Sequence, residues 1–199
     1  MVNASPMTAL ASLPVRMSVD EFLDWASVTD GRWQLVDGVP YAMAPAGLVH
    51  GALQSEFSRL IGNHLRVTGS ACATIIAPGV VPRFLAQHNM RVPDIAVTCT
   101  AFGRDARALT EPVLIVEILS PSNQAATWAN VWAYTSIPSM RDIVVLRSDR
   151  VEASLLHRLP DGTWPDRPVE IDQGALSLES IGLVLPLVDV YATTGLSLK

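Results

Sequence analysis

Hydrophobic positions along the chain follow two different periods, and the change of period separates predicted helices from predicted strands. Between Val49 and Val67 the apolar residues recur at helical spacing, with Leu53, Phe57 and Ile61 on one stripe, which predicts a long amphipathic helix. The run 113–119 is almost continuously apolar and has the length of a strand, so it predicts a strand buried on both faces. The chain therefore contains both helices and buried strands.

Local signals predict the remaining elements. Ser18 followed by Glu21 is a capping box that opens a short helix, and Asp37-Gly38 is a hairpin turn signal between two extended segments, 32–37 and 39–43. We also predict extended segments at 71–77, 80–85, 92–98, 143–146, 151–159 and 169–171, and helices at 120–135 and 185–194. This interleaving predicts an α/β (α+β) domain in which helices flank a mixed β-sheet.

Length and composition favour one globular domain. The chain has 199 residues, of which 49% are hydrophobic and 17% are charged, which suits a single compact core. Residues 1–16 contain two prolines and only one basic residue, so we predict a flexible N-terminal arm and a domain spanning 17–199. No apolar run approaches the roughly 20 residues of a membrane span, and we expect a cytoplasmic protein in which Cys72 and Cys99 are reduced core thiols.

The formal net charge of −5 argues against a broad basic surface that would coat nucleic acid. It does not exclude a nuclease, because a bound divalent cation offsets local negative charge. Every basic residue except Lys199 is an arginine.

Two carboxylates stand out because they lie beside or within buried strands. Asp94 precedes the apolar run 95–97, and Glu117 lies inside the run 114–119. A buried carboxylate costs several kcal/mol unless it is paired, hydrogen-bonded or bound to a metal. Two of them on neighbouring strands would suit Mg²⁺. The alternatives are an ion pair of Glu117 with Arg91 or Arg83, and a capping role for Asp94.

Two polar residues have equally open roles. His50 begins the long helix on its inward side, where it is either a satisfied core histidine or a group that positions water or a phosphate. Gln34 lies opposite Trp33 and Leu35 in its predicted strand and has the same ambiguity. Trp128 and Trp132 are spaced four residues apart on a predicted helix, which is typical of core or of a partner surface.

Taken together, several motifs resemble the Uma-two family of predicted endonucleases, which have a restriction-endonuclease-like fold. The resemblance covers about residues 17 to 195. The matching segments, in chain order, are 33–38, His50, 92–97, 116–122 and 134–139. By position, the resemblance implies that Asp94 and Glu117 are the acidic pair of a PD-(D/E)xK site, that the Ile118 carbonyl is a further metal ligand, and that His50 is the helix histidine. It implies hydrolysis of DNA phosphodiester bonds with Mg²⁺ or Mn²⁺.

The chain departs from the family pattern at three positions. The family lysine is Asn130 here, the strand glutamate is Gln34, and the aspartate one turn before the lysine is Ala126. Asparagine supplies no positive charge, and losing such a charge typically costs about 10²–10³ in rate. Two hypotheses therefore stand: a metal-dependent DNA endonuclease, or a catalytically impaired relative that binds nucleic acid or protein. A homodimer is a candidate assembly, because cutting both strands needs two sites.

Overall fold

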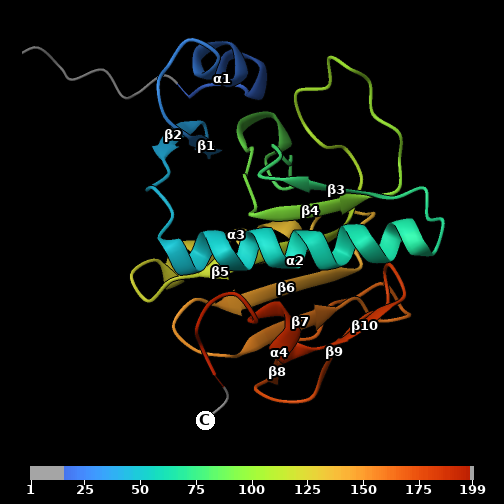
Figure 1. Ribbon diagram of the computed structural model, residues 1–199. Helices are drawn as coiled ribbons and strands as arrows, with labels where there is room; N and C mark the ends of the chain where they lie inside the picture. Colours follow the sequence, from blue (N-terminus) through green and yellow to red (C-terminus); the bar gives the residue numbers. More distant parts are fainter. Residues whose placement is uncertain (1–15, 198–199) are drawn as a thin grey trace, which may run out of the picture.

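The computed structural model describes residues 16–197, and its centre is a six-stranded mixed sheet (Figure 1). The strand order is β3-β4-β5-β6-β7-β8, in which β5 and β6 are parallel and all other neighbours are antiparallel. The strands of this sheet are β3 (Ala73–Ile76), β4 (Ile95–Thr98), β5 (Pro112–Leu119), β6 (Asp142–Arg147), β7 (Ala153–His157) and β8 (Val169–Ile171). The predicted mixed sheet flanked by helices is confirmed, as one domain.

Helices cover both faces of this sheet. α2 (Leu48–Val67) crosses one face and buries the stripe predicted from its period, Leu53, Phe57, Ile61 and Leu65. α3 (Gln124–Tyr134) covers the other face, where it connects the parallel strands β5 and β6. The inward side chains of each strand alternate between these two cores, so Val116 faces α2 and Ile115 faces the α3 core.

A smaller unit of hairpin and helix lies beside the sheet. α1 (Val19–Ala26) has the predicted capping box, since Ser18 Oγ accepts from the Glu21 N–H and Glu21 accepts from the Ser18 N–H. β1 (Trp33–Val36) and β2 (Val39–Ala42) form the predicted hairpin. Leu35 exchanges backbone hydrogen bonds with Met90, at 2.8 and 3.0 Å, which attaches β1 to the segment that leads into β4.

Two predicted elements are wrong. The segment 80–85 is not a strand, because Pro82 has no N–H and Leu85 adopts a left-handed conformation before the short 3-10 helix η1 (Ala86–His88). The segment 185–194 is not one helix. It begins inside β10 (Leu183–Pro186), which pairs with the unpredicted β9 (Ala175–Leu178), and only the single turn α4 (Leu187–Val190) follows.

The expectation of reduced thiols is also contradicted, because Cys72 and Cys99 form a disulfide. Ala73 pairs with Thr98 at the end of the β3–β4 ladder, so the next residue on each strand is a cysteine facing its partner. The sequence separation of 27 residues gave no sign of this register. The predicted arm falls almost wholly on residues outside the described ones.

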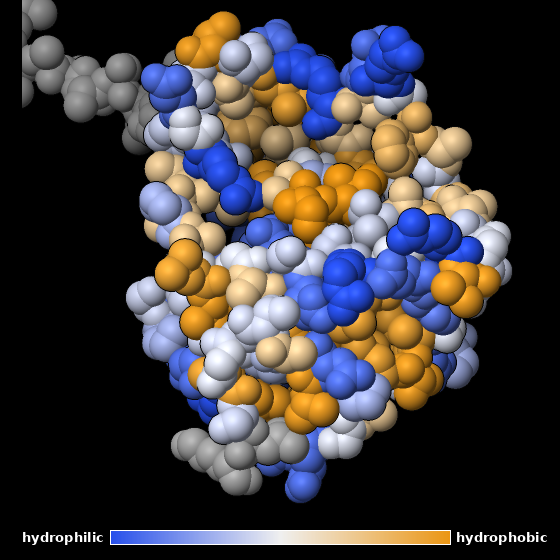
Figure 2. All heavy atoms as spheres, viewed as in Figure 1, coloured by the Kyte–Doolittle hydropathy of each residue, from blue (hydrophilic) through white to orange (hydrophobic). Residues whose placement is uncertain are grey.

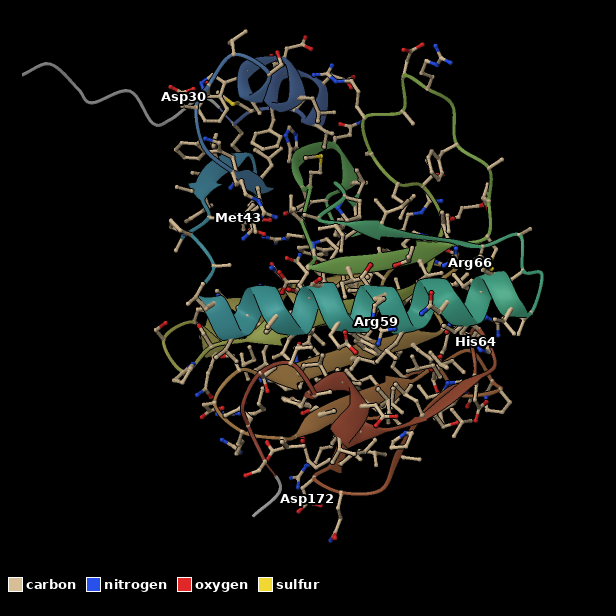
Figure 3. The ribbon with its side chains drawn as sticks, in the orientation of Figure 1. Asp30, Met43, Arg59, His64, Arg66 and Asp172 are labelled. Carbon is tan, nitrogen blue, oxygen red and sulfur yellow. A yellow bond between two sulfur atoms is a disulfide. The ribbon has the colours of Figure 1, made fainter. Side chains whose placement is uncertain are left out.

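Polar side chains follow the outward side of α2, and apolar side chains gather next to it over β3 and η1 (Figure 2). Ile76, Phe84 and Leu85 are among the exposed large apolar residues of that segment. On α2 itself, Arg59 and Arg66 lie on the helix surface (Figure 3), where they bond to Glu56 and Asn63. No helix within residues 16–197 is long and apolar enough to cross a membrane.

Candidate metal centre

The pairing of β4 with β5 brings the two candidate carboxylates together. Ile95 pairs with Val116 at the end of the antiparallel ladder, so continuing the register by one residue sets Asp94 opposite Glu117. Opposed residues of an antiparallel pair have Cβ atoms about 4.5–5.5 Å apart on the same face. Both residues are buried, with exposed fractions of 8% for Asp94 and 6% for Glu117.

Asp94 is held from two sides. Its Oδ2 accepts a 2.7 Å hydrogen bond from the Ile118 N–H of β5, and its Oδ1 lies 2.8 Å from Nε2 of His50 at the start of α2. One turn further along the same helix, Gln54 Nε2 donates to the Asp94 backbone carbonyl at 2.8 Å. The first two turns of α2 therefore fix the position of Asp94, and His50 is the side chain that contacts its carboxylate.

Glu117 is held by α3. Its Oε1 accepts a 2.8 Å hydrogen bond from the Tyr134 hydroxyl. Burial, and then the nearby charge of Asp94, raise the pKa of Glu117 well above its ordinary value, while hydrogen bonding from Tyr134 and Asn130 acts in the opposite direction. Burial and the neighbouring Glu117 likewise raise the pKa of the Tyr134 hydroxyl. The pair is thus electrostatically unfavourable when both carboxyl groups are ionised.

Gln34 and Asn130 complete the cluster. Asn130 Nδ2 donates to Gln34 Oε1 at 3.3 Å, which joins β1 to α3 across the site. Asn130 is almost buried, with an exposed fraction of 9%. The structure therefore brings together all five side chains that the sequence singled out: Gln34, His50, Asp94, Glu117 and Asn130.

The arginines offered as alternative partners of Glu117 do not pair with it. Among residues 16–197, neither Arg91 nor Arg83 forms an ion pair with a carboxylate. Arg91 is 8% exposed, its Nε has no hydrogen-bond partner, and burial lowers the pKa of its guanidinium. The Glu117 carboxylate is therefore not neutralised by a protein cation in the described part of the chain.

The donor set suits a hard divalent cation that takes few protein ligands. Within residues 16–197 no group of three or more His, Cys, Asp or Glu side chains has a metal-binding arrangement, so a site here would rest on the two carboxylates. Mg²⁺ is typically held by one or two carboxylates, with waters and substrate phosphates filling its octahedron. The opposed pair Asp94 and Glu117 fits that requirement.

Two residues of the site were not predicted as functional. Gln54 lies one helical turn after His50, and Tyr134 lies one turn after Asn130. Residues four apart share a helix face, so the spacing alone could have indicated both. What the sequence could not give was the partner atom of each side chain.

Comparisons with known proteins agree with the observed fold. The model of the Uma2 family, described as "Putative restriction endonuclease", matches residues 19–187. An uncharacterized protein of Synechocystis is 30% identical over 178 residues, which cover 88% of this chain and 92% of that protein. A crystal structure from Anabaena variabilis, described as a "putative nuclease belonging to DUF820", is similar with a TM-score of 0.69 at 16% identity, covering 88% of this chain and 98% of that one.

Proposed function

Because the chain belongs to the Uma2 family of restriction-endonuclease-like proteins, we propose that it is a divalent-metal-dependent endonuclease that hydrolyses phosphodiester bonds of DNA. One observation carries the proposal. Asp94 and Glu117 face each other in a buried position, and within residues 16–197 no arginine forms an ion pair with either carboxylate. Like charges directly opposed on a sheet are destabilising, so this arrangement persists most easily where a cation is bound.

The proposed ligands of Mg²⁺ or Mn²⁺ are the carboxylates of Asp94 and Glu117 and the backbone carbonyl of Ile118. The Ile118 N–H already donates to Asp94 Oδ2, and in an antiparallel ladder the N–H and C=O of one residue point toward the same neighbouring strand. This supports the Ile118 carbonyl as the third protein ligand. A hard cation prefers such oxygen ligands.

The side chains around the pair have separate roles in this proposal. When bound, the metal polarises the scissile phosphate and lowers the pKa of a bound water. His50 contacts Asp94 Oδ1, and its role in this proposal is to position that carboxylate and the attacking water. Tyr134 fixes Glu117, and the neutral pair Asn130–Gln34 can hold a water or contact a phosphate oxygen.

A second candidate function is a DNA-binding relative that no longer cuts. The observation that favours it is the Asn130–Gln34 pair, because neither side chain carries a charge where the family has a lysine and a glutamate. The arginines of α2 do not compensate, since Arg59 and Arg66 bond to side chains of their own helix on its surface. This candidate predicts salt-dependent DNA affinity without cleavage.

A plasmid-nicking assay separates the two functions. The purified full chain is incubated with supercoiled plasmid and Mg²⁺ or Mn²⁺, next to Asp94→Ala and a control at an exposed residue, Asp166→Ala. The endonuclease proposal expects nicking by the wild type and by Asp166→Ala, and none by Asp94→Ala. Equal nicking by all three would identify a contaminant, and no nicking with either metal would leave the non-cutting relative.

Assembly and location are part of the same proposal. The apolar side chains exposed beside α2 support a homodimer, which light scattering of the purified chain would test. We also propose that the protein is located in the cytoplasm, because its proposed partner is DNA. The Cys72–Cys99 bond makes thiol titration of protein isolated from the cytoplasm the direct test, since cytosolic thiols are usually kept reduced.

A further inference from the structure

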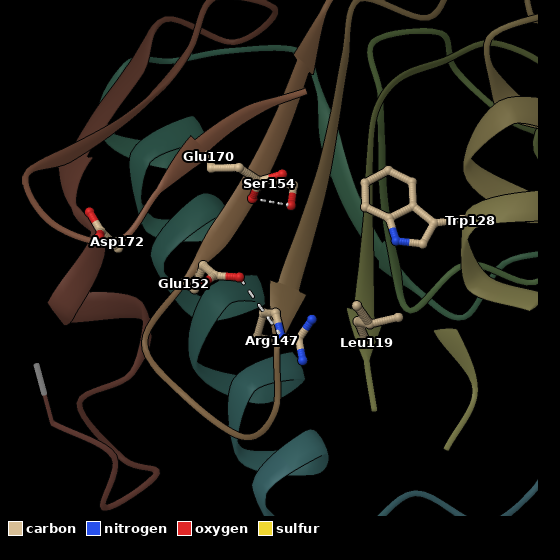
Figure 4. Close-up of a pocket in the computed structure, with 7 residues that line it drawn as sticks. All are labelled: Leu119, Trp128, Arg147, Glu152, Ser154, Glu170 and Asp172. Atoms are coloured by element: carbon tan, nitrogen blue, oxygen red, sulfur yellow. Dashed lines mark hydrogen bonds and ion pairs between the residues drawn. The ribbon is translucent and has the colours of Figure 1, made fainter. Parts of the chain in front are cut away.

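A cavity of about 330 Å³ lies on the α3 face of the sheet (Figure 4). One wall is the indole of Trp128 from α3, and the other side chains come from β5, β6, β7 and β8 and from the residues just before β7 and just after β8. The lining consists of Leu119, Trp128, Arg147, Glu152, Ser154, Glu170 and Asp172. No role for this cavity follows from the metal centre itself.

The strand register relates the cavity to the metal centre. Glu117 pairs with Val145, Val145 with Ser154, and Ser154 with Glu170, so these residues form one row across one face of the sheet. Neighbouring strands are about 4.8 Å apart, so Ser154 in the cavity lies roughly 10 Å from Glu117 along this row. The next row begins at Leu119, two residues after Glu117, and continues to Arg147.

The cavity combines an aromatic wall with one aliphatic side chain, Leu119, in an otherwise polar lining. The Trp128 indole faces Leu119 and the strands in Figure 4, and the ring is only partly buried. Aromatic side chains of this kind bind single-stranded nucleic acid by stacking on a base, and each stacked base is worth about 1–3 kcal/mol. The wall therefore suits a flat, unpaired ring.

The charges of the lining select the part of a nucleotide that can enter. Glu152 bonds to Arg150 and lies 3.9 Å from Arg147, and Glu170 accepts a 2.7 Å hydrogen bond from Ser154. Asp172 is exposed at the cavity edge. Arg147 itself bonds to Asp149, so Glu170 and Asp172 are carboxylates of the lining that no arginine pairs within residues 16–197. These two carboxylates disfavour a phosphate and favour groups that donate hydrogen bonds. The exocyclic amines of bases are such donors.

We propose that this cavity is a subsite for an unstacked nucleobase that carries an exocyclic amino group, namely cytosine, adenine or guanine. The proposal rests on the proposed function, because it assigns the base to a nucleotide near the scissile phosphate. Trp128 stacks on the ring, Glu170 or Asp172 accepts from the amine, and Arg147 donates to a ring or carbonyl acceptor. Thymine has no amino group and is disfavoured.

Fluorescence anisotropy with labelled homopolymers tests the subsite without requiring cleavage. The full chain is titrated with oligodeoxycytidine and with oligothymidine of equal length, with Ca²⁺ in place of Mg²⁺. We expect about tenfold tighter binding of oligodeoxycytidine, which is within the range of one stacked and hydrogen-bonded base. Equal affinities, or no binding of either oligonucleotide, would overturn the proposal.

Matched variants on the same elements assign the effect to the cavity. Trp128→Ala is compared with Trp132→Ala, which removes an exposed tryptophan of the same helix that does not line the cavity. Only Trp128→Ala is expected to lose the preference, and Trp128→Phe is expected to restore most of it. Similarly, Asp172→Asn combined with Glu170→Gln should reduce the preference, while the exposed control Asp166→Asn should not. Thermal unfolding of each variant shows whether the fold is kept.

The two assays distinguish failure of the endonuclease proposal from failure of the subsite proposal. A base preference that depends on Trp128, found in a protein that never nicks plasmid, would support the subsite and reject the endonuclease. Nicking that depends on Asp94, with identical affinities for the two oligonucleotides and no difference between Trp128→Ala and Trp132→Ala, would reject the subsite alone.

Discussion

Two buried carboxylates on neighbouring strands of the same sheet have opposite surroundings. Asp142 at the start of β6 is fully buried, and both of its oxygens have partners: Nδ1 of His157 at 2.6 Å and the Ser180 N–H at 2.8 Å. Glu117 on β5 is almost as deeply buried, and it faces the carboxylate of Asp94. Its Oε1 accepts a hydrogen bond from the Tyr134 hydroxyl.

The difference separates a structural carboxylate from the proposed metal ligand. Asp142 connects β6 to β7 and to the turn after β9, and its hydrogen bonds compensate for its burial. The arrangement around Glu117 is unfavourable until another group neutralises the pair. Local arrangements that conflict with folding stability are expected chiefly at functional sites. Burial of a carboxylate therefore does not by itself indicate a functional site, whereas burial of a carboxylate without a counter-charge does.

The largest expected effect concerns activity. Glu117→Gln keeps the shape and the Tyr134 hydrogen bond but removes a metal-binding charge, so we expect nicking to fall by at least about 10²–10³. Asp142→Asn, assayed at a temperature where it is folded, should retain nearly full activity. Plasmid nicking rates at saturating Mg²⁺ provide the measurement, and equal losses for both variants would remove the distinction.

The second effect is a gain of nicking activity. Asn130→Lys restores a positive charge at the family's lysine position, next to Glu117, and we expect nicking to increase by about tenfold to a hundredfold. Gln124→Lys adds the same charge at the exposed start of α3 and should change little. If Asn130→Lys leaves the nicking rate unchanged in a folded protein, the missing lysine does not limit that rate.

The third effect concerns the free energy of unfolding, for which we expect Asp142 to matter more than Glu117. Asp142→Asn replaces the charge-assisted hydrogen bonds of a buried carboxylate to the Ser180 N–H and His157 with weaker neutral ones, which we expect to cost about 1–3 kcal/mol. Glu117→Gln removes a like-charge contact and should leave the metal-free free energy of unfolding unchanged or higher. Urea unfolding without metal provides both values. A larger loss for Glu117→Gln would show that its carboxylate is structural.

Much of the fold followed from the sequence because local signals and periods act over short distances. The capping box at Ser18, the turn at Asp37-Gly38 and the helix stripe of Leu53 and Phe57 each depend on neighbours within a few residues. The error at 185–194 has the same origin. Leu183 and Leu185 are buried, and Val184 between them is exposed, because β10 pairs with β9, and such pairing is non-local.

The candidate site was predictable in its residue types and not in its contacts. A carboxylate inside an apolar strand is unusual enough to single out Glu117, yet Asp142 at the start of another apolar strand satisfies the same criterion. Only the structure distinguishes them, because His157 lies opposite Asp142 in the β6–β7 register, whereas the carboxylate of Asp94 lies opposite Glu117 in the β4–β5 register. The Cys72–Cys99 bond likewise depends on a register that spacing does not determine.

The smallest expected effect is a pH dependence that only Glu117 produces. Burial and Asp94 raise the pKa of Glu117 in the folded protein above its unfolded value of about 4.3. Between these two pKa values the folded state binds the extra proton, so the metal-free free energy of unfolding falls as the pH rises through that window. Glu117→Gln has no such proton and should lack this part of the slope.

Mg²⁺ should reverse the trend in the wild type. Metal binding requires the ionised carboxylates, so the stabilisation by Mg²⁺ grows with pH and reaches about 2.7 kcal/mol at a hundredfold excess over Kd. Urea unfolding with and without Mg²⁺, at pH values below and above neutrality, measures both slopes. Asp142→Asn should keep the Mg²⁺ response of the wild type and Glu117→Gln should lose most of it. Identical responses from these two variants would mean that Mg²⁺ binds elsewhere on the chain.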